Sequence, residues 1–202
     1  HYKERTEHLF RDALVGLWAT AKRIFADKRV FMFMLAFFFY IDGVHTIITM
    51  STSYGTDLGI GSTQLVLALL VTQFVAFPCA ILYGRMAGRF GCKAMIVAAV
   101  VAYMCIVFFA AFFLVSAAQF WILAILVGMF QGGIQALSRS YYGKIIPKDH
   151  ANEYYGFFDI FGKYATIMGT LLVSVFTQLT GSSSYGVLSV AVLFIVGFIL
   201  LW

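Results

Sequence analysis

The sequence predicts an all-α integral membrane protein with six transmembrane helices, preceded by an amphipathic helix, and three observations support this prediction. Of the 202 residues, 62% are hydrophobic and only 11% are charged, whereas soluble domains have about 45–50% apolar and about 25% charged residues. Mean hydropathy is +0.91, and a chain this short cannot cover so apolar an interior with polar surface. Six stretches are each long enough to cross a bilayer as a helix.

Residues 1–29 precede the spans and form the first predicted region, a cytoplasmic linker. Apolar residues recur at helical spacing over 9–25, which predicts an amphipathic helix lying on the membrane surface. We expect it to position the first span, with a regulatory element as the alternative. Its apolar face comprises Leu9, Phe10, Ala13, Leu14, Leu17, Trp18, Ala21, Ile24 and Phe25.

The predicted spans are 30–54, 63–84, 93–115, 119–142, 154–178 and 185–202. The loops between them are too short to contain a soluble domain. Cys79, Cys92 and Cys105 lie in or beside spans without metal-ligand spacing, and no nucleotide-binding glycine loop is present. We therefore expect no cofactor and no ATP-driven pump.

The positive charges predict the orientation of the spans. All 14 Lys and Arg residues lie before the first span, between the second and third, or from the end of the fourth into the fifth. The loops 55–62, 116–118 and 179–184 contain none. By the positive-inside rule, the N-terminus and the basic loops face the cytoplasm. The net charge of +5 then reflects topology and anionic lipid, and we expect no nucleic-acid partner.

Polar residues are distributed over the spans with a period of three helices. The first and fourth spans are polar, the second and fifth mixed, and the third and sixth nearly apolar. Because three is odd, the second trio enters the membrane from the other side. The sequence thus predicts two inverted three-helix repeats, over 30–115 and 116–202, a plan common in secondary transporters.

The first span carries one polar stripe, and Asp42 stands near its middle. Asp42, Thr46, Thr49 and Ser53 follow helical spacing. A charged residue near the bilayer centre costs about 2.5–3.5 kcal/mol on insertion scales, so Asp42 should face a cavity or a partner. The functional hypothesis is a proton or cation site assisted by His45. The alternative is a carboxyl group that only packs neighbouring helices together.

The other spans add candidates for the same pathway and for a charge cluster. Gln131 and Gln135 share one face of the fourth span, beside a small-residue ladder that includes Gly128 and Gly132, and Gln73 lies in the second span. Arg139, Asp159 and Lys163 form the predicted charge cluster at the cytoplasmic level, where Asp159 and Lys163 can pair at i, i+4. This cluster is either structural or a gate that moves with the transport cycle.

One run between the second and third spans resembles a known signature. Residues 84–93 read Gly-Arg-Met-Ala-Gly-Arg-Phe-Gly-Cys-Lys, which is similar to the Gly-x-x-x-Asp-Arg/Lys-x-Gly-Arg/Lys-Arg/Lys loop of the major facilitator superfamily. In this chain Gly88 stands where the family has Asp, and Cys92 stands where the family has one of its basic residues. A carboxylate-based latch at this loop is therefore not expected. The motif residues are Gly84, Arg85, Arg89, Gly91 and Lys93.

Longer runs are similar to the vacuolar (autophagy-related) amino-acid effluxer-like branch of that superfamily, over residues 30–202. They include 39–47, 72–78, 131–140, 155–159 and 178–182. The resemblance implies the C-terminal half of a major facilitator fold, with the first and fourth helices lining the pathway. Asp42, His45, Thr46, Gln131 and Gln135 would then face the solute.

The sequence therefore predicts the C-terminal domain of a secondary active transporter for a small solute, such as an amino acid, working by alternating access. The expected partners are the lipid bilayer, the solute and a missing N-terminal half of six helices; the isolated half is expected to form a homodimer. The expected location is the cell inner (plasma) membrane, or the vacuolar membrane in a eukaryote. An intramembrane enzyme is not expected, because no nucleophile elbow or His-Glu-x-x-His helix occurs. The alternative is a non-transporting sensor or scaffold that retains the transporter fold.

Overall fold

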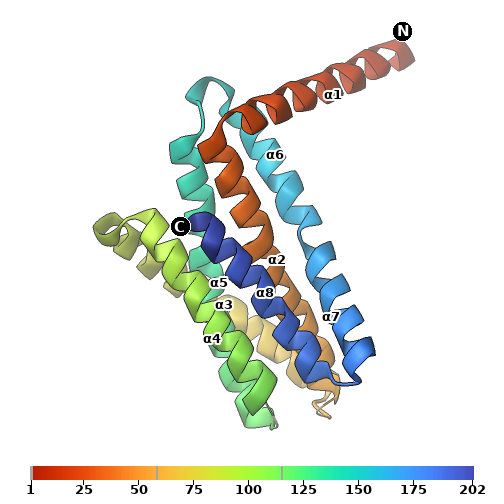
Figure 1. Cartoon of the computed structure of the whole chain (residues 1–202), viewed down its shortest axis with the longest axis vertical. Coiled ribbons are helices and arrows are strands. Elements are labelled where there is room, and N and C mark those ends of the chain that lie inside the picture. The colour runs from red at the N-terminus through yellow and green to blue at the C-terminus, as the bar shows by residue number, and fades with distance from the viewer. Residues whose placement is uncertain (1, 58, 115) are drawn as a thin grey trace.

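The computed structural model describes residues 2–57, 59–114 and 116–202, and the side chains of these residues from Leu14 onward. Figure 1 shows the long helices lined up as a bundle, with α1 projecting from one end. The elements are α1 (Tyr2–Ala26), α2 (Lys28–Asp57), α3 (Ser62–Phe90), α4 (Cys92–Phe113), α5 (Ala117–Ile145), η1 (Lys148–His150), α6 (Ala151–Tyr164), α7 (Thr166–Thr180) and α8 (Ser183–Leu201).

The prediction of six membrane spans is confirmed. Helices α2, α3, α4, α5 and α8 are each long and apolar enough to cross a membrane, and η1, α6 and α7 together form the fifth span in chain order. That span contains a turn at Ala165, between α6 and α7. Residue 165 is an alanine, which gives no signal for a helix break. The pattern of apolar residues therefore predicted a continuous helix over 154–178.

The junction between α3 and α4 is shorter than the predicted loop over 84–93. Gly91 alone separates the two helices, with φ 91° and ψ 145°, a conformation that a side chain would strain. Gly84, Arg85 and Arg89 therefore belong to α3, and Lys93 lies in the first turn of α4. The prediction of a loop was wrong because nothing in 84–90 interrupts helical hydrogen bonding before Gly91.

The positive charges gather at one end of the bundle. This end, where α2 and α4 begin and α3 and α5 finish, is called the basic end here (Figure 1). It carries Lys28, Arg29, Arg85, Arg89, Lys93, Lys144 and Lys148.

Close backbone contact determines how the spans pack. The most extensive interface joins α3 to α5, where a Cβ at Gly128 would lie 2.7 Å from the carbonyl oxygen of Thr72 and one at Gly132 2.5 Å from that of Ala76. This confirms Gly128 and Gly132 as a close-packing ladder. Helix α8 packs on α2 and α4, and α4 also packs on α5.

The contacts between helices repeat when the first three spans are matched to the last three. In this match α2 is equivalent to α5, α3 to α6–α7, and α4 to α8. The contact of α3 with α5 then corresponds to that of α7 with α2, and the contact of α8 with α2 to that of α4 with α5. This correspondence is what a repeat of three spans would produce. The division of the chain at residues 115 and 116 stays a prediction.

Helix α1 is docked on the bundle by its C-terminal turns. Thr20, Ala21 and Ile24 are buried, and the hydroxyl of Thr20 donates to Oε2 of Glu153 in α6 at 2.7 Å. Leu14, Trp18 and Phe25 of the predicted apolar face are 52%, 68% and 61% exposed. The predicted helix is confirmed, but its apolar face is divided between the bundle and an exposed surface. Leu9, Phe10 and Ala13 lie outside the described side chains.

Candidate functional site

A charged cavity opens on one face of the bundle, between α2, α5, α6 and α7. Its volume is about 700 Å³. His45 from α2 and Gln135 from α5 contribute polar groups, while Phe37 and Phe158, whose rings stack with centroids 4.0 Å apart, contribute an apolar wall. The charged groups are Arg139, Asp159 and Lys163.

One ion pair crosses this cavity. Nη1 of Arg139 donates to Oδ1 of Asp159 at 2.8 Å, and both side chains are about half exposed. The guanidinium of Arg139 also lies over the ring of Tyr155, 5.0 Å from its centroid. The pair thus joins α5 to α6. Asp159 and Lys163 could pair by their spacing, but the ion pair that the structure gives Asp159 is with Arg139 on a neighbouring helix.

Removing this ion pair is expected to change stability little. Half-exposed pairs contribute about 0.2–1 kcal/mol, so Arg139→Gln should lower the free energy of unfolding by less than about 1 kcal/mol. A double-mutant cycle with Asp159→Asn, followed by denaturation in detergent, measures the coupling. If the pair is a gate, each single variant also slows transport, by up to about fivefold, because a 1 kcal/mol change in a barrier changes the rate about fivefold.

The charge-swapped protein is the matched control for this prediction. Arg139→Asp combined with Asp159→Arg retains an ion pair at the same place. Recovery of transport in the swapped protein supports the gate. Transport that follows the small stability changes, with no recovery on swapping, supports a purely structural cluster.

Asp42 lies beside the charged cavity, in the contact between α2 and α7. Its side chain is fully buried; Oδ2 accepts the backbone N–H of Gly169 at 2.8 Å, and Oδ1 accepts the hydroxyl of Thr46 at 3.3 Å. Gly169 lies in the first turn of α7, after the turn at Ala165, where a helix dipole favours a carboxylate. A Cβ at Gly169 would overlap Oγ1 of Thr46, so the glycine permits this close contact.

A second cavity lies on the other side of this contact, toward the opposite end of the bundle. It has a volume of about 340 Å³ and is lined mainly by α2 and α7, with hydroxyl groups and Asp57. Along α7, Thr166 lines the charged cavity, Gly169 binds Asp42, and Thr170 lines the second cavity. The buried carboxyl group therefore lies between two polar cavities.

The remaining predicted pathway residues do not line the charged cavity. Thr46 is buried against Asp42, and Thr49 is exposed with its hydroxyl bonded to the carbonyl of His45. Gln73 is exposed on α3. Gln131 is buried, and its Oε1 has no hydrogen-bond partner among the described residues. Of the seven pathway candidates, the structure brings His45 and Gln135 into this cavity.

Several lining residues were not singled out from the sequence. On α6, Phe158 directly precedes Asp159, and Gly162 directly precedes Lys163. On α5, Ala136 follows Gln135. Helical periodicity over 158–166 could have placed these residues on one face. The contact of Glu153 with α1 has no sequence signal, because its partner Thr20 is 133 residues away.

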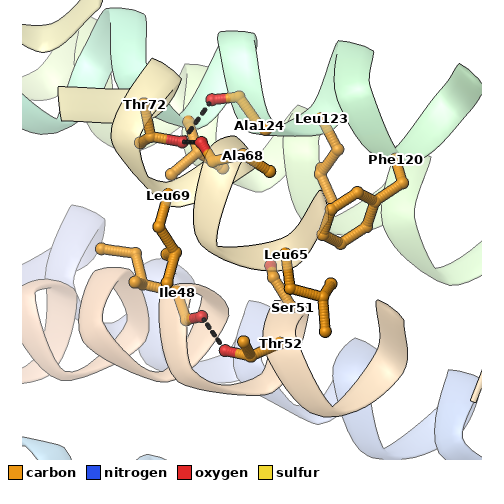
Figure 2. A pocket seen from close by; sticks show the side chains of 11 residues that line it. Ile48, Ser51, Thr52, Leu65, Ala68, Leu69, Thr72, Phe120, Leu123 and Ala124 are labelled. Carbon is orange, nitrogen blue, oxygen red and sulfur yellow. Dashed lines mark hydrogen bonds between the residues drawn. The ribbon is translucent and has the colours of Figure 1, made fainter. Parts of the chain in front are cut away.

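A small apolar cavity between α2, α3 and α5 is too small to bind a solute. Figure 2 shows that its hydroxyl groups turn to the backbone: Thr72 donates to the carbonyls of Ala68 and Ala124, and Thr52 to that of Ile48. About 30 Å³ remains, which accommodates one water molecule. Thr72 thus helps to pack α3 on α5.

One protein family and one bacterial protein match this chain over essentially its full length. The sequence profile of the family described as "Vacuole effluxer Atg22 like" matches residues 1–202. The chain is 52% identical over 201 residues to the uncharacterized MFS-type transporter YxiO of Bacillus subtilis, covering 100% of this chain and 47% of YxiO.

Fungal relatives match more distantly. Autophagy-related protein 22 of Cryptococcus neoformans is 25% identical over 198 residues, covering 90% of this chain and 36% of the relative. Autophagy-related protein 22 of Saccharomyces cerevisiae is 26% identical over 182 residues, covering 85% of this chain and 34% of the relative. The chain therefore spans about half the length of YxiO and about a third of the fungal proteins.

Proposed function

Because the chain belongs to the family of Atg22-like vacuole effluxers, we propose that it is the C-terminal half of a secondary transporter that moves a small solute across a membrane by alternating access. This proposal rests on the charged cavity. It presents two cations, an anion, His45 and an amide on one face of the bundle of six spanning helices. An open cavity lined by polar and charged groups between spanning helices suits a solute pathway.

The chemistry of the cavity favours an amino acid as the solute. An amino acid carries a carboxylate and an ammonium group. Arg139 and Asp159 form an ion pair of the same two charges at 2.8 Å, so a zwitterion can replace each partner by a group of the same charge. The carboxylate would bind Arg139 and Lys163, and the ammonium would bind Asp159. No charge would then be left unpaired as the solute enters.

The other wall of the cavity would come from a further six helices. YxiO is about twice as long as the part that this chain matches, which leaves room for an N-terminal half of similar size. Residues 1–29 would then be the linker between the halves. In isolation, the half would cover its charged face with a second copy.

Asp42 is the proposed coupling site. It lies between the charged cavity and the cavity toward the opposite end, so a proton or small cation could reach it from either side as the cavities open in turn. His45, which lines the charged cavity, would be the neighbouring polar group on the route. The packing role of Asp42, through Gly169 and Thr46, is the alternative.

The chain is a multi-pass membrane protein, and its orientation is part of the proposal. The basic end would face the cytoplasm under the positive-inside rule, which also places the N-terminus there. The membrane would be the plasma membrane in a bacterium and the vacuolar membrane in a eukaryote.

Counterflow tests the proposal. The full-length natural protein is reconstituted in liposomes loaded with unlabelled amino acids, and uptake of labelled amino acids is followed. We expect uptake above that of protein-free liposomes, with a fall of about tenfold or more in Asp159→Asn, because the ammonium loses its partner. Lys148→Gln, outside the cavity, is the matched control and should transport normally.

Two outcomes would contradict a transporter for amino acids. If amino acids bind the reconstituted protein but do not exchange, the alternative of a sensor or scaffold that keeps the fold is favoured. If neither binding nor exchange occurs in a protein that remains folded, the solute class is wrong.

A further inference from the structure

A basic pocket lies away from the charged cavity, at the basic end between α2, α4, α5 and α8. Its volume is about 550 Å³. Lys28, Arg29 and Lys93 carry its positive charges, while Phe33 and Leu201 provide an apolar floor in which each side chain is only 4% exposed. Trp202, beside the floor, is 89% exposed. The pocket is therefore cationic at its rim and apolar at its base.

The three cations of this pocket form no ion pair with an acidic side chain among the described residues. Within the described part of the chain, the ion pairs involve Arg23, Arg139 and His150, and none includes Lys28, Arg29 or Lys93. Asp27 precedes them, but its Oδ1 caps α2 by accepting the backbone N–H groups of Arg29 and Val30 at 3.0 and 3.3 Å. Like charges converge here without compensation, which indicates an anionic ligand.

The apolar floor distinguishes between a soluble anion and a lipid. The pocket lies at the ends of spanning helices, where the hydrocarbon region gives way to the headgroup region. A free phosphate would not use Phe33 or Leu201, whereas a phospholipid places a phosphate beside its glycerol and acyl carbons.

We propose that this pocket binds the headgroup of an anionic phospholipid. The phosphate would contact Lys28, Arg29 and Lys93, with the guanidinium of Arg29 suited to two-pronged phosphate binding, and the glycerol region would cover Phe33 and Leu201. This lipid site is independent of the proposed solute and its cavity. It would hold α2, α4 and α8 together at one membrane surface.

Native mass spectrometry of the full-length natural protein in detergent tests this site. Phosphatidylglycerol and phosphatidylcholine are titrated separately, and bound lipid is counted. We expect about tenfold or stronger preference for phosphatidylglycerol. The triple variant Lys28→Gln, Arg29→Gln and Lys93→Gln should weaken its binding about 100-fold, at roughly fivefold for each charge. Lys93→Arg, which keeps the charge, should bind as the natural protein does.

The matched control removes three charges from the same end but outside the pocket. It is Arg85→Gln, Arg89→Gln and Lys148→Gln, and it should keep the preference for phosphatidylglycerol. Equal loss in both triple variants would overturn the proposal, because general surface charge would then explain the binding. Equal binding of phosphatidylcholine would overturn it as well. Displacement of the lipid by inorganic phosphate at similar concentration would show that the ligand is a soluble anion and refute a lipid site.

Discussion

Replacing Asp42 by Asn is expected to reduce gradient-driven accumulation of the solute to the level seen in protein-free liposomes, while counterflow persists. Asn has the shape of Asp and can still accept the N–H of Gly169, a bond of 2.8 Å to Oδ2 in this structure. It cannot gain or lose a proton, and it offers no charge to a cation. The measurement is uptake against an imposed proton or sodium gradient, beside counterflow without a gradient.

Stability separates the two roles of Asp42. A charged residue near the bilayer centre costs about 2.5–3.5 kcal/mol on insertion scales, so the neutral variant should unfold at the same or a higher temperature. Thr46→Val is the matched control, because it removes one hydrogen bond to the carboxyl group and leaves the carboxyl itself. Gradient-driven accumulation that survives in Asp42→Asn would refute the coupling site. A folded state lost together with both activities would favour the packing role.

Replacing Gly132 is expected to have the largest effect on folding. A Cβ at Gly132 would lie 2.5 Å from the carbonyl oxygen of Ala76, and because this neighbour is backbone, α3 must move away from α5. Gly132→Ala should lower the free energy of unfolding by about 1–3 kcal/mol, and Gly132→Leu should leave no folded protein in detergent. The measurements are thermal unfolding and the yield of monodisperse protein.

Gly88→Ala is the matched control for this change. Gly88 also lies within a helix, but a Cβ there meets nothing within 4 Å in this chain. The same added methyl group should therefore leave stability unchanged or raise it by about 0.5–1 kcal/mol. If Gly132→Ala proves as stable as Gly88→Ala, the close approach of α3 and α5 does not stabilise the bundle.

Composition and periodicity were sufficient to predict much of the fold. Water cannot hydrate a chain that is 62% hydrophobic, and within a bilayer each backbone group must be satisfied along its own helix. Six apolar stretches therefore became six spans, with ends moved by a few residues. The helical spacing of Gly128 and Gly132 was likewise enough to predict a close contact, because only small residues permit one.

The candidate site depended on relations between helices that sequence spacing does not encode. Asp159 and Lys163 stand at i, i+4 and could pair, yet Asp159 bonds to Arg139 at 2.8 Å because α5 and α6 meet at that level. Asp42 stands on the same stripe as Thr49, yet it is buried while Thr49 is exposed. Asp42 is covered because α7 meets α2 at its level along the helix, where the backbone N–H of Gly169 reaches the carboxyl group.

The sequence by itself determined what each segment must be: membrane-spanning, polar on certain helices, and basic at one end. These are local properties, since the free energy of placing a helix in a bilayer is a sum over its own residues. Only the tertiary structure decided which polar groups share a cavity, which carboxylate is buried against a helix start, and where three cations converge without an ion-pair partner among the described residues. Those outcomes depend on how rigid helices rotate and approach one another, and that is set by packing between residues far apart in the chain.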